Sequence, residues 1–95
     1  MATFFIRTEL YKAGTDTDGQ DFIAERYTII REHKDGSRFA YTQTFKGAER
    51  WDDREGDWGW NDVRDEAFQA AETLMTTLSD QHQDWVQIDP LYGVG

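Results

Sequence analysis

The stretch FIAERYTIIREHKDGSRFAYTQTF, residues 22–45, decides the fold of this chain. It contains two runs rich in β-branched and aromatic residues, which favour strands at about 22–33 and 38–45. Asp35-Gly36 between them is a preferred centre of a two-residue type I′ turn, because both central positions of that turn need a positive φ. The sequence therefore predicts an antiparallel hairpin in which the numbers of paired residues add up to 71.

The predicted register sorts the side chains of the hairpin into two faces. One face, which we expect to be the core face, collects seven residues: Phe22, Ala24, Thr28, Ile30, Phe39, Tyr41 and Phe45. The opposite face is not cleanly polar, since it carries Ile23, Tyr27 and Ile29. This remaining apolar surface is available to a partner.

Outside the hairpin, the sequence predicts two further strands and a helix. Alternating side chains indicate a strand over 3–12, and WVQI at 85–88 indicates a short last strand. A helix over about 62–80, capped by Asn61 or Asp62, is indicated by a stripe at helical spacing: Val63, Ala67, Ala70, Ala71, Leu74 and Leu78. Residues 46–60 carry three glycines and no apolar period, which is typical of a long loop, and 91–95 read as a loose tail.

The order of the expected elements along the chain is β-β-β-α-β. A chain of 95 residues makes one domain, residues 1–95. An antiparallel sheet and a single amphipathic helix bury their apolar faces against each other. The sequence therefore predicts an α+β fold, a two-layer domain with one helix packed on one face of an antiparallel sheet.

The composition indicates a protein of the cell interior. The chain has no cysteine, which excludes disulfides and thiolate metal sites. No stretch approaches the roughly 20 apolar residues of a membrane span. The first residues meet Arg7 without a long apolar region, unlike a secretory signal. We therefore expect a cytoplasmic protein that does not bind membranes.

The net charge of −9 arises entirely in the second half of the chain. Residues 1–48 hold seven acidic and seven basic side chains, whereas residues 49–95 hold twelve acidic side chains and three arginines. The candidate partner-binding residues lie in the most acidic part: Asp52, Asp53, Glu55, Asp57, Trp58, Trp60, Asp62, Asp65 and Glu66. Such a surface attracts basic protein grooves, and tryptophan is enriched at binding hot spots. The plainer interpretation is a solvated acidic loop that keeps the protein soluble.

Patterns for catalysis and metal binding are weak in this sequence. Asp53, Glu55 and Asp57 alternate as in an EF-hand, but Trp58 stands where that loop needs glycine and Arg64 where it needs an acid. Two histidines are too few for a zinc site, and no phosphate loop or nucleophile elbow occurs. We therefore expect no enzyme activity, no metal and no cofactor, with a small metal-dependent or acid–base module as a minor alternative.

The acidic run at 52–62 with its tryptophans, followed by the acidic start of the expected helix, carries a resemblance. It resembles the small, acidic, cysteine-free proteins of phages and mobile elements, anti-CRISPR proteins among them. The likeness is one of composition and architecture over the whole chain. It implies a single α+β domain that occupies a basic groove or blocks an interface.

The sequence therefore favours a non-enzymatic protein-binding inhibitor. Its acidic edge would imitate nucleic-acid phosphates and bind the basic surface of a nucleic-acid-handling protein, of the CRISPR-type defence class. Direct binding to nucleic acid is not expected, because the net charge of −9 repels phosphates. The alternative is a structural or assembly module that pairs with a second copy through Ile23, Tyr27 and Ile29, or through a strand edge. Both a monomer and a homodimer stay open.

Overall fold

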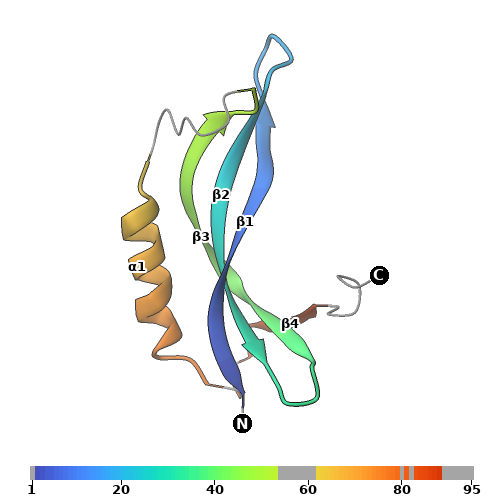
Figure 1. Cartoon of the computed structure of the whole chain (residues 1–95), viewed down its shortest axis with the longest axis vertical. Helices are drawn as coiled ribbons and strands as arrows, with labels where there is room; N and C mark the ends of the chain where they lie inside the picture. Colours follow the sequence, from blue (N-terminus) through green and yellow to red (C-terminus); the bar gives the residue numbers. More distant parts are fainter. Residues whose placement is uncertain (1, 54–61, 80, 82, 89–95) are drawn as a thin grey trace.

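A computed structural model of the chain describes residues 2–53, 62–79, 81 and 83–88. Its elements are β1 (Thr3–Thr15), β2 (Asp21–Glu32), β3 (Arg38–Trp51), α1 (Arg64–Met75) and β4 (Trp85–Ile88). The strands form one antiparallel sheet in the order β1-β2-β3-β4, and α1 packs against one face of it (Figure 1). The predicted α+β class, with one helix on an antiparallel sheet, is confirmed.

The turn between β2 and β3 is one residue longer than predicted. His33 N–H donates to the carbonyl of Ser37, and Gly36 N–H donates to the carbonyl of His33, both at 2.9 Å. Three residues, Lys34 to Gly36, therefore form the loop, and Gly36 takes the positive φ of 91°. This is the type I turn with a glycine bulge that three-residue hairpins favour. Asp35 holds it by accepting bonds from the N–H and hydroxyl of Ser37 at 2.9 and 2.7 Å.

The longer turn changes which side chains share a face. Next to the turn, paired residues add up to 70 rather than 71, as in Arg31 opposite Phe39. A slip of one residue moves every side chain of one strand to the other face of the sheet. After an irregularity beyond Ile30, Tyr27 lies opposite Phe45. Phe39 and Phe45 therefore do not join the face that was expected to be the core.

The face covered by α1 is the one that was expected to remain open. Ala67 and Ala71 of the helix form a buried cluster with Tyr27, against which Ile6 and Phe45 pack. Ile29 was expected to be available to a partner. It lies on this face because it pairs with Ile6, and its side chain is fully buried. Four residues of the expected core face point away from the helix instead: Phe22, Ala24, Thr28 and Ile30. We call that side, which α1 does not cover, the open face, although Ala24, Thr28 and Ile30 on it are buried.

β3 continues through residues that were expected to begin the long loop. Glu49, Arg50 and Trp51 pair with Ala24, Ile23 and Phe22 of β2. The sequence Lys46–Arg50 has little strand propensity of its own, but β2 offers it unpaired backbone groups along its whole length. Backbone pairing with a strong neighbouring strand outweighs local propensity. The region between β3 and α1 is therefore shorter than predicted.

α1 is also shorter than the predicted helix over 62–80. Val63 occupies the N-cap position without a side-chain hydrogen bond, and Asp62 instead accepts a bond from Arg64 N–H at 3.3 Å. At the other end, the hydroxyls of Thr76 and Thr77 donate to carbonyls one turn earlier, both at 2.7 Å. These bonds satisfy carbonyls that the ending helix leaves without partners.

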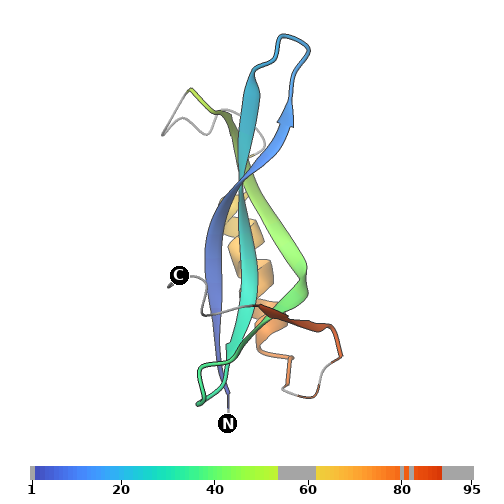
Figure 2. The ribbon, with the colours of Figure 1, turned by 90° about the vertical axis from the view of Figure 1, so that its right-hand side faces the viewer.

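β4 is fastened to the sheet by Trp85. Its ring lies edge-on to Tyr41 and Phe4, with centroids 5.1 and 5.8 Å apart, and its indole N–H donates to the carbonyl of Ser79 at 3.1 Å. The guanidinium of Arg31, which is 6% exposed, lies 4.8 Å from the Trp85 ring. Trp85 thus joins β1, β2, β3 and the segment after α1, and Figure 2 shows that segment crossing back to β4.

Candidate protein-binding surface

Five aspartates gather at the end of the sheet where β1 meets β2 and β3 stops. We call this the acidic end; it comprises Asp16, Asp18, Asp21, Asp52 and Asp53. The pairing of β1 with β2 closes at Thr15 and Asp21, and the N–H of Asp52 donates to the carbonyl of Asp21 at 3.0 Å. The β1–β2 loop and the end of β3 therefore adjoin, as the top of Figure 1 shows.

The β1–β2 loop holds its aspartates in a defined conformation. The carboxylate of Asp16 accepts bonds from the N–H groups of Asp18 and Gln20, both at 2.9 Å. Backbone bonds join Asp16 to Gln20 and Gly19 at 2.9 and 3.1 Å, and Gly19 takes a φ of 83° that favours glycine. An ordered loop presents its carboxylates at a lower entropic cost of binding than a loose one.

Two basic side chains reduce the charge of the acidic end without cancelling it. Lys12 Nζ lies 3.5 Å from a carboxylate oxygen of Asp21, and Arg50 donates to the carbonyls of Trp51 and Asp52 at 3.2 and 3.3 Å. The hydroxyl of Thr15 also donates to Asp21 at 2.7 Å, and this bond, helped by Lys12, lowers the pKa of the Asp21 carboxyl. Five carboxylates beside two cations leave the acidic end with a net negative charge.

A second acidic group, Asp62, Asp65 and Glu66, surrounds the start of α1. All three side chains are exposed. Asp62 receives two bonds from the guanidinium of Arg64, at 2.9 and 2.7 Å, and these bonds lower the pKa of its carboxyl. Asp65 and Glu66 lie in the first turn of the helix, where the helix dipole favours negative charge.

The helix start is held against β3 at a fixed distance from the acidic end. Val63 N–H donates to the carbonyl of Gly47 at 3.1 Å. Gly47 and Asp52 are five residues apart along β3, which is about 16 Å in a strand. The two acidic groups therefore lie on the same half of the molecule. Glu55, Asp57, Trp58 and Trp60, the other predicted binding residues, lie outside the described residues, as do Asn61 and the predicted tail.

Sequence reasoning missed three members of the acidic end. Asp16, Asp18 and Asp21 were not among the predicted binding residues, because they lie 31 to 36 residues before Asp52 in the chain. The pairing of β2 with β3 brings them together. The available signal was the hairpin itself, since an antiparallel partner of β2 must end near the point where β2 begins.

The open face of the sheet carries cations, but acidic neighbours bind them. Glu9 accepts from Arg7 at 2.8 Å, from Arg26 at 3.2 Å and from the hydroxyl of Thr28 at 3.0 Å. Partial burial raises the pKa of Glu9, yet these donors together lower it. Two further pairs on this sheet join Arg38 to Glu32 at 2.8 Å and Lys46 to Glu49 at 2.9 Å. This face therefore offers little unbalanced positive charge to a phosphate.

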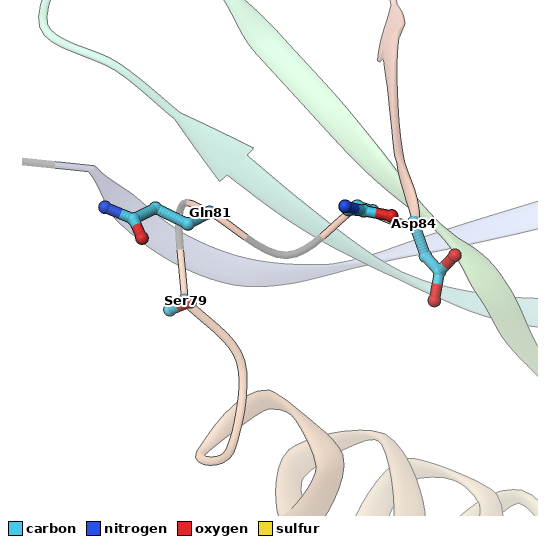
Figure 3. Close-up of a pocket in the computed structure, with 4 residues that line it drawn as sticks. Ser79, Gln81 and Asp84 are labelled. Carbon is cyan, nitrogen blue, oxygen red and sulfur yellow. The ribbon is translucent and has the colours of Figure 1, made fainter.

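The polar side chains that line the depression beside the segment after α1 do not converge on a common point (Figure 3). This depression of about 440 Å³ lies between α1 and β4 and is lined by Ser79, Gln81, Gln83 and Asp84. Figure 3 shows Gln81 and Asp84 pointing away from each other rather than toward a common point. In the described part of the chain, no three His, Asp or Glu side chains are placed to hold a metal ion. The aspartates of the acidic end are thus spread out rather than convergent.

Similarity to known proteins does not indicate a role for this surface. Comparison of the chain with protein-family models, with curated proteins and with solved structures finds no match. No helix among the described residues is long and apolar enough to cross a membrane. Function must therefore be argued from the chemistry of the surface itself.

Proposed function

We propose that this protein is a non-enzymatic inhibitor that binds the basic groove of a nucleic-acid-handling protein, with CRISPR-type defence proteins as the class of target. The observation that supports the proposal is the acidic end, where two separate segments of the chain, joined by the bond from Asp52 N–H to the Asp21 carbonyl, carry five aspartates. The acidic start of α1 lies on the same half of the molecule. Such a target works in the cytoplasm, where we also expect this protein to act.

The physical basis of the proposal is competition with phosphate. Neighbouring strands lie about 4.8 Å apart, so carboxylates on adjoining segments approach the charge spacing of a nucleic-acid backbone, about 3.4 Å per charge on one strand. A groove lined with Lys and Arg is attracted to either surface, and the attraction speeds association. Hydrogen bonds within the β1–β2 loop fix the carboxylate of Asp16 and the loop backbone before binding, which reduces the entropy lost in the complex.

The predicted binding residues divide into two roles in this proposal. Asp52, Asp53, Asp62, Asp65 and Glu66 are exposed and supply charge to the contact. We assign the same role to Glu55 and Asp57 from the sequence. Trp58 and Trp60 supply apolar anchor area, since charge alone steers a partner but adds limited affinity.

Neutralising the acidic end tests the proposal. We expect the variant Asp52→Asn/Asp53→Asn to bind its target about tenfold more weakly than the wild type, because each exposed ion pair contributes up to about 1 kcal/mol. The immobilised protein is incubated with nuclease-treated bacterial lysate at about 0.1 M salt. Proteins that about 1 M salt releases are then identified and their affinities measured.

The matched control is Gln81→Lys/Gln83→Lys, which changes the net charge by the same two units at exposed sites. They belong to the segment between α1 and β4, which lies at the end of the molecule away from the β1–β2 loop (Figure 2). The proposal expects the control to bind like the wild type. Equal losses in both variants would show that only the net charge matters, and would contradict a defined acidic contact.

A further inference from the structure

The outer edge of β1 is long and regular. β1 pairs with β2 over Thr3–Thr15, with an irregularity only between Lys12 and Gly14. Among the described residues, no strand pairs with its other side. Leu10 on this strand is 57% exposed. An edge of this kind offers a row of backbone donors and acceptors to another strand, and native proteins usually protect such edges.

The side chains that precede Thr8 in β1 are complementary to those that follow it. Residues 5–11 are FIRTELY: an aromatic, an aliphatic and a cation precede the threonine, and an anion, an aliphatic and an aromatic follow it. A second β1 running antiparallel, with Thr8 opposite Thr8, would therefore place Phe5 opposite Tyr11, Ile6 opposite Leu10 and Arg7 opposite Glu9. Aromatic, apolar and opposite-charge pairs are the cross-strand pairs that stabilise sheets.

Neighbouring registers lack this complementarity. Shifting the pairing by two residues, which keeps the same faces aligned, places Arg7 opposite Arg7 or Glu9 opposite Glu9. Like charges directly opposite each other destabilise a pair. A shift by one residue would align the helix-covered face of one copy with the open face of the other. The sequence of β1 therefore selects one register of self-pairing.

We propose that the protein forms a homodimer in which two β1 strands pair antiparallel about Thr8, joining the two sheets into one. The twofold axis is perpendicular to the sheet, so both helices lie on one side of it. Every interface pair occurs twice by symmetry except Thr8 with Thr8, which lies on the axis, and Leu10 becomes covered by Ile6 of the second copy. This proposal is independent of the acidic end, and either can fail without the other.

The first test measures mass by light scattering over a range of concentrations. The wild type should show twice the 11.1 kDa of the chain. The variant Leu10→Lys should raise the dimer Kd about tenfold, because it removes both Ile6–Leu10 pairs. The control Val86→Lys makes the same change at a residue that is 55% exposed on the other edge strand and should leave the Kd unchanged. A wild-type monomer up to about 0.1 mM overturns the proposal.

The second test determines the register. Because the chain has no cysteine, Thr8→Cys introduces a single thiol, and the two thiols of a dimer would stand directly opposite each other. Directly opposed Cβ atoms are about 5 Å apart, close to disulfide distance, so mild oxidation should yield a covalent dimer. Thr3→Cys places its thiols ten residues apart, about 33 Å, and should not cross-link. Cross-linking of the Thr3 variant at the same rate would overturn the register.

Discussion

Replacing Trp85 by alanine is expected to lower the free energy of unfolding by about 3 kcal/mol, a large fraction of the stability of a domain of this size. The ring packs edge-on against Phe4 and Tyr41, and it lies 4.8 Å from the guanidinium of Arg31. Truncation removes the ring contacts with Phe4 and Tyr41, and it uncovers one side of the Arg31 guanidinium beside the gap. Denaturant unfolding of wild type and variant measures the difference.

The effect should be specific to the tryptophan rather than to β4. Val86 is the next residue of the strand and is 55% exposed, so Val86→Ala should change stability by no more than about 0.5 kcal/mol. Hydrogen exchange adds a local readout: in Trp85→Ala, the amides of Arg38–Tyr41, which pair with β4, should exchange faster. A loss below about 1 kcal/mol would contradict the role assigned to Trp85.

Replacing Gly47 by valine is expected to lower the free energy of unfolding by about 2 kcal/mol or more. A Cβ atom at this position would lie 2.9 Å from Cγ of Arg64 and 3.2 Å from the ring of Tyr27. Tyr27 cannot move aside easily, because it is buried under α1 and its hydroxyl donates to Glu25. The helix would be pushed away from β3. Thermal or denaturant unfolding checks the expectation.

Two comparisons make the Gly47 result interpretable. Thr44→Val introduces valine at an exposed position of the same strand and should change stability by at most about 0.5 kcal/mol. Combining Gly47→Val with Arg64→Ala removes one of the two close contacts, so the valine should cost less in that background. An unchanged cost would show that the helix start does not approach β3 at Gly47.

The parts of the fold that depend on local signals could be predicted from the sequence. Asp35-Gly36 marks a turn because few other residue pairs adopt the positive φ that tight hairpin turns need. The alternating side chains of β1 indicate a strand, and the spacing of Ala67 and Ala71 indicates a helix. These signals were sufficient for the order β-β-β-α-β. They act within a few residues and need no knowledge of the partner strand.

The parts that depend on pairing could not be predicted. Two-residue and three-residue turns can both contain Asp35-Gly36, and the choice between them decides whether Phe39 and Tyr41 together share a face with Ile30 or with Arg31. β2 carries apolar side chains on both faces, including the fully buried neighbours Ile29 and Ile30. The pattern alone therefore did not show which face the helix would cover.

The candidate site likewise has one part that local sequence predicted and one part that only strand pairing creates. Asp52, Asp53 and the start of α1 were identified because they are adjacent in sequence. Asp16, Asp18 and Asp21 join them only through pairing of strands that are distant in the chain. If β1 also pairs with a second copy, the two acidic ends point in opposite directions, and one dimer would engage two grooves.

The most direct test of the central claim, that the acidic end takes the place of nucleic acid, is a competition measurement. A protein that binds at low salt and leaves at high salt is loaded on the immobilised chain and titrated with short duplex DNA or RNA. The account predicts displacement at nucleic-acid concentrations near the partner's own affinity for it, and weaker retention of the partner on Asp52→Asn/Asp53→Asn. A stable ternary complex, with nucleic acid and this protein bound together at full occupancy, would contradict it.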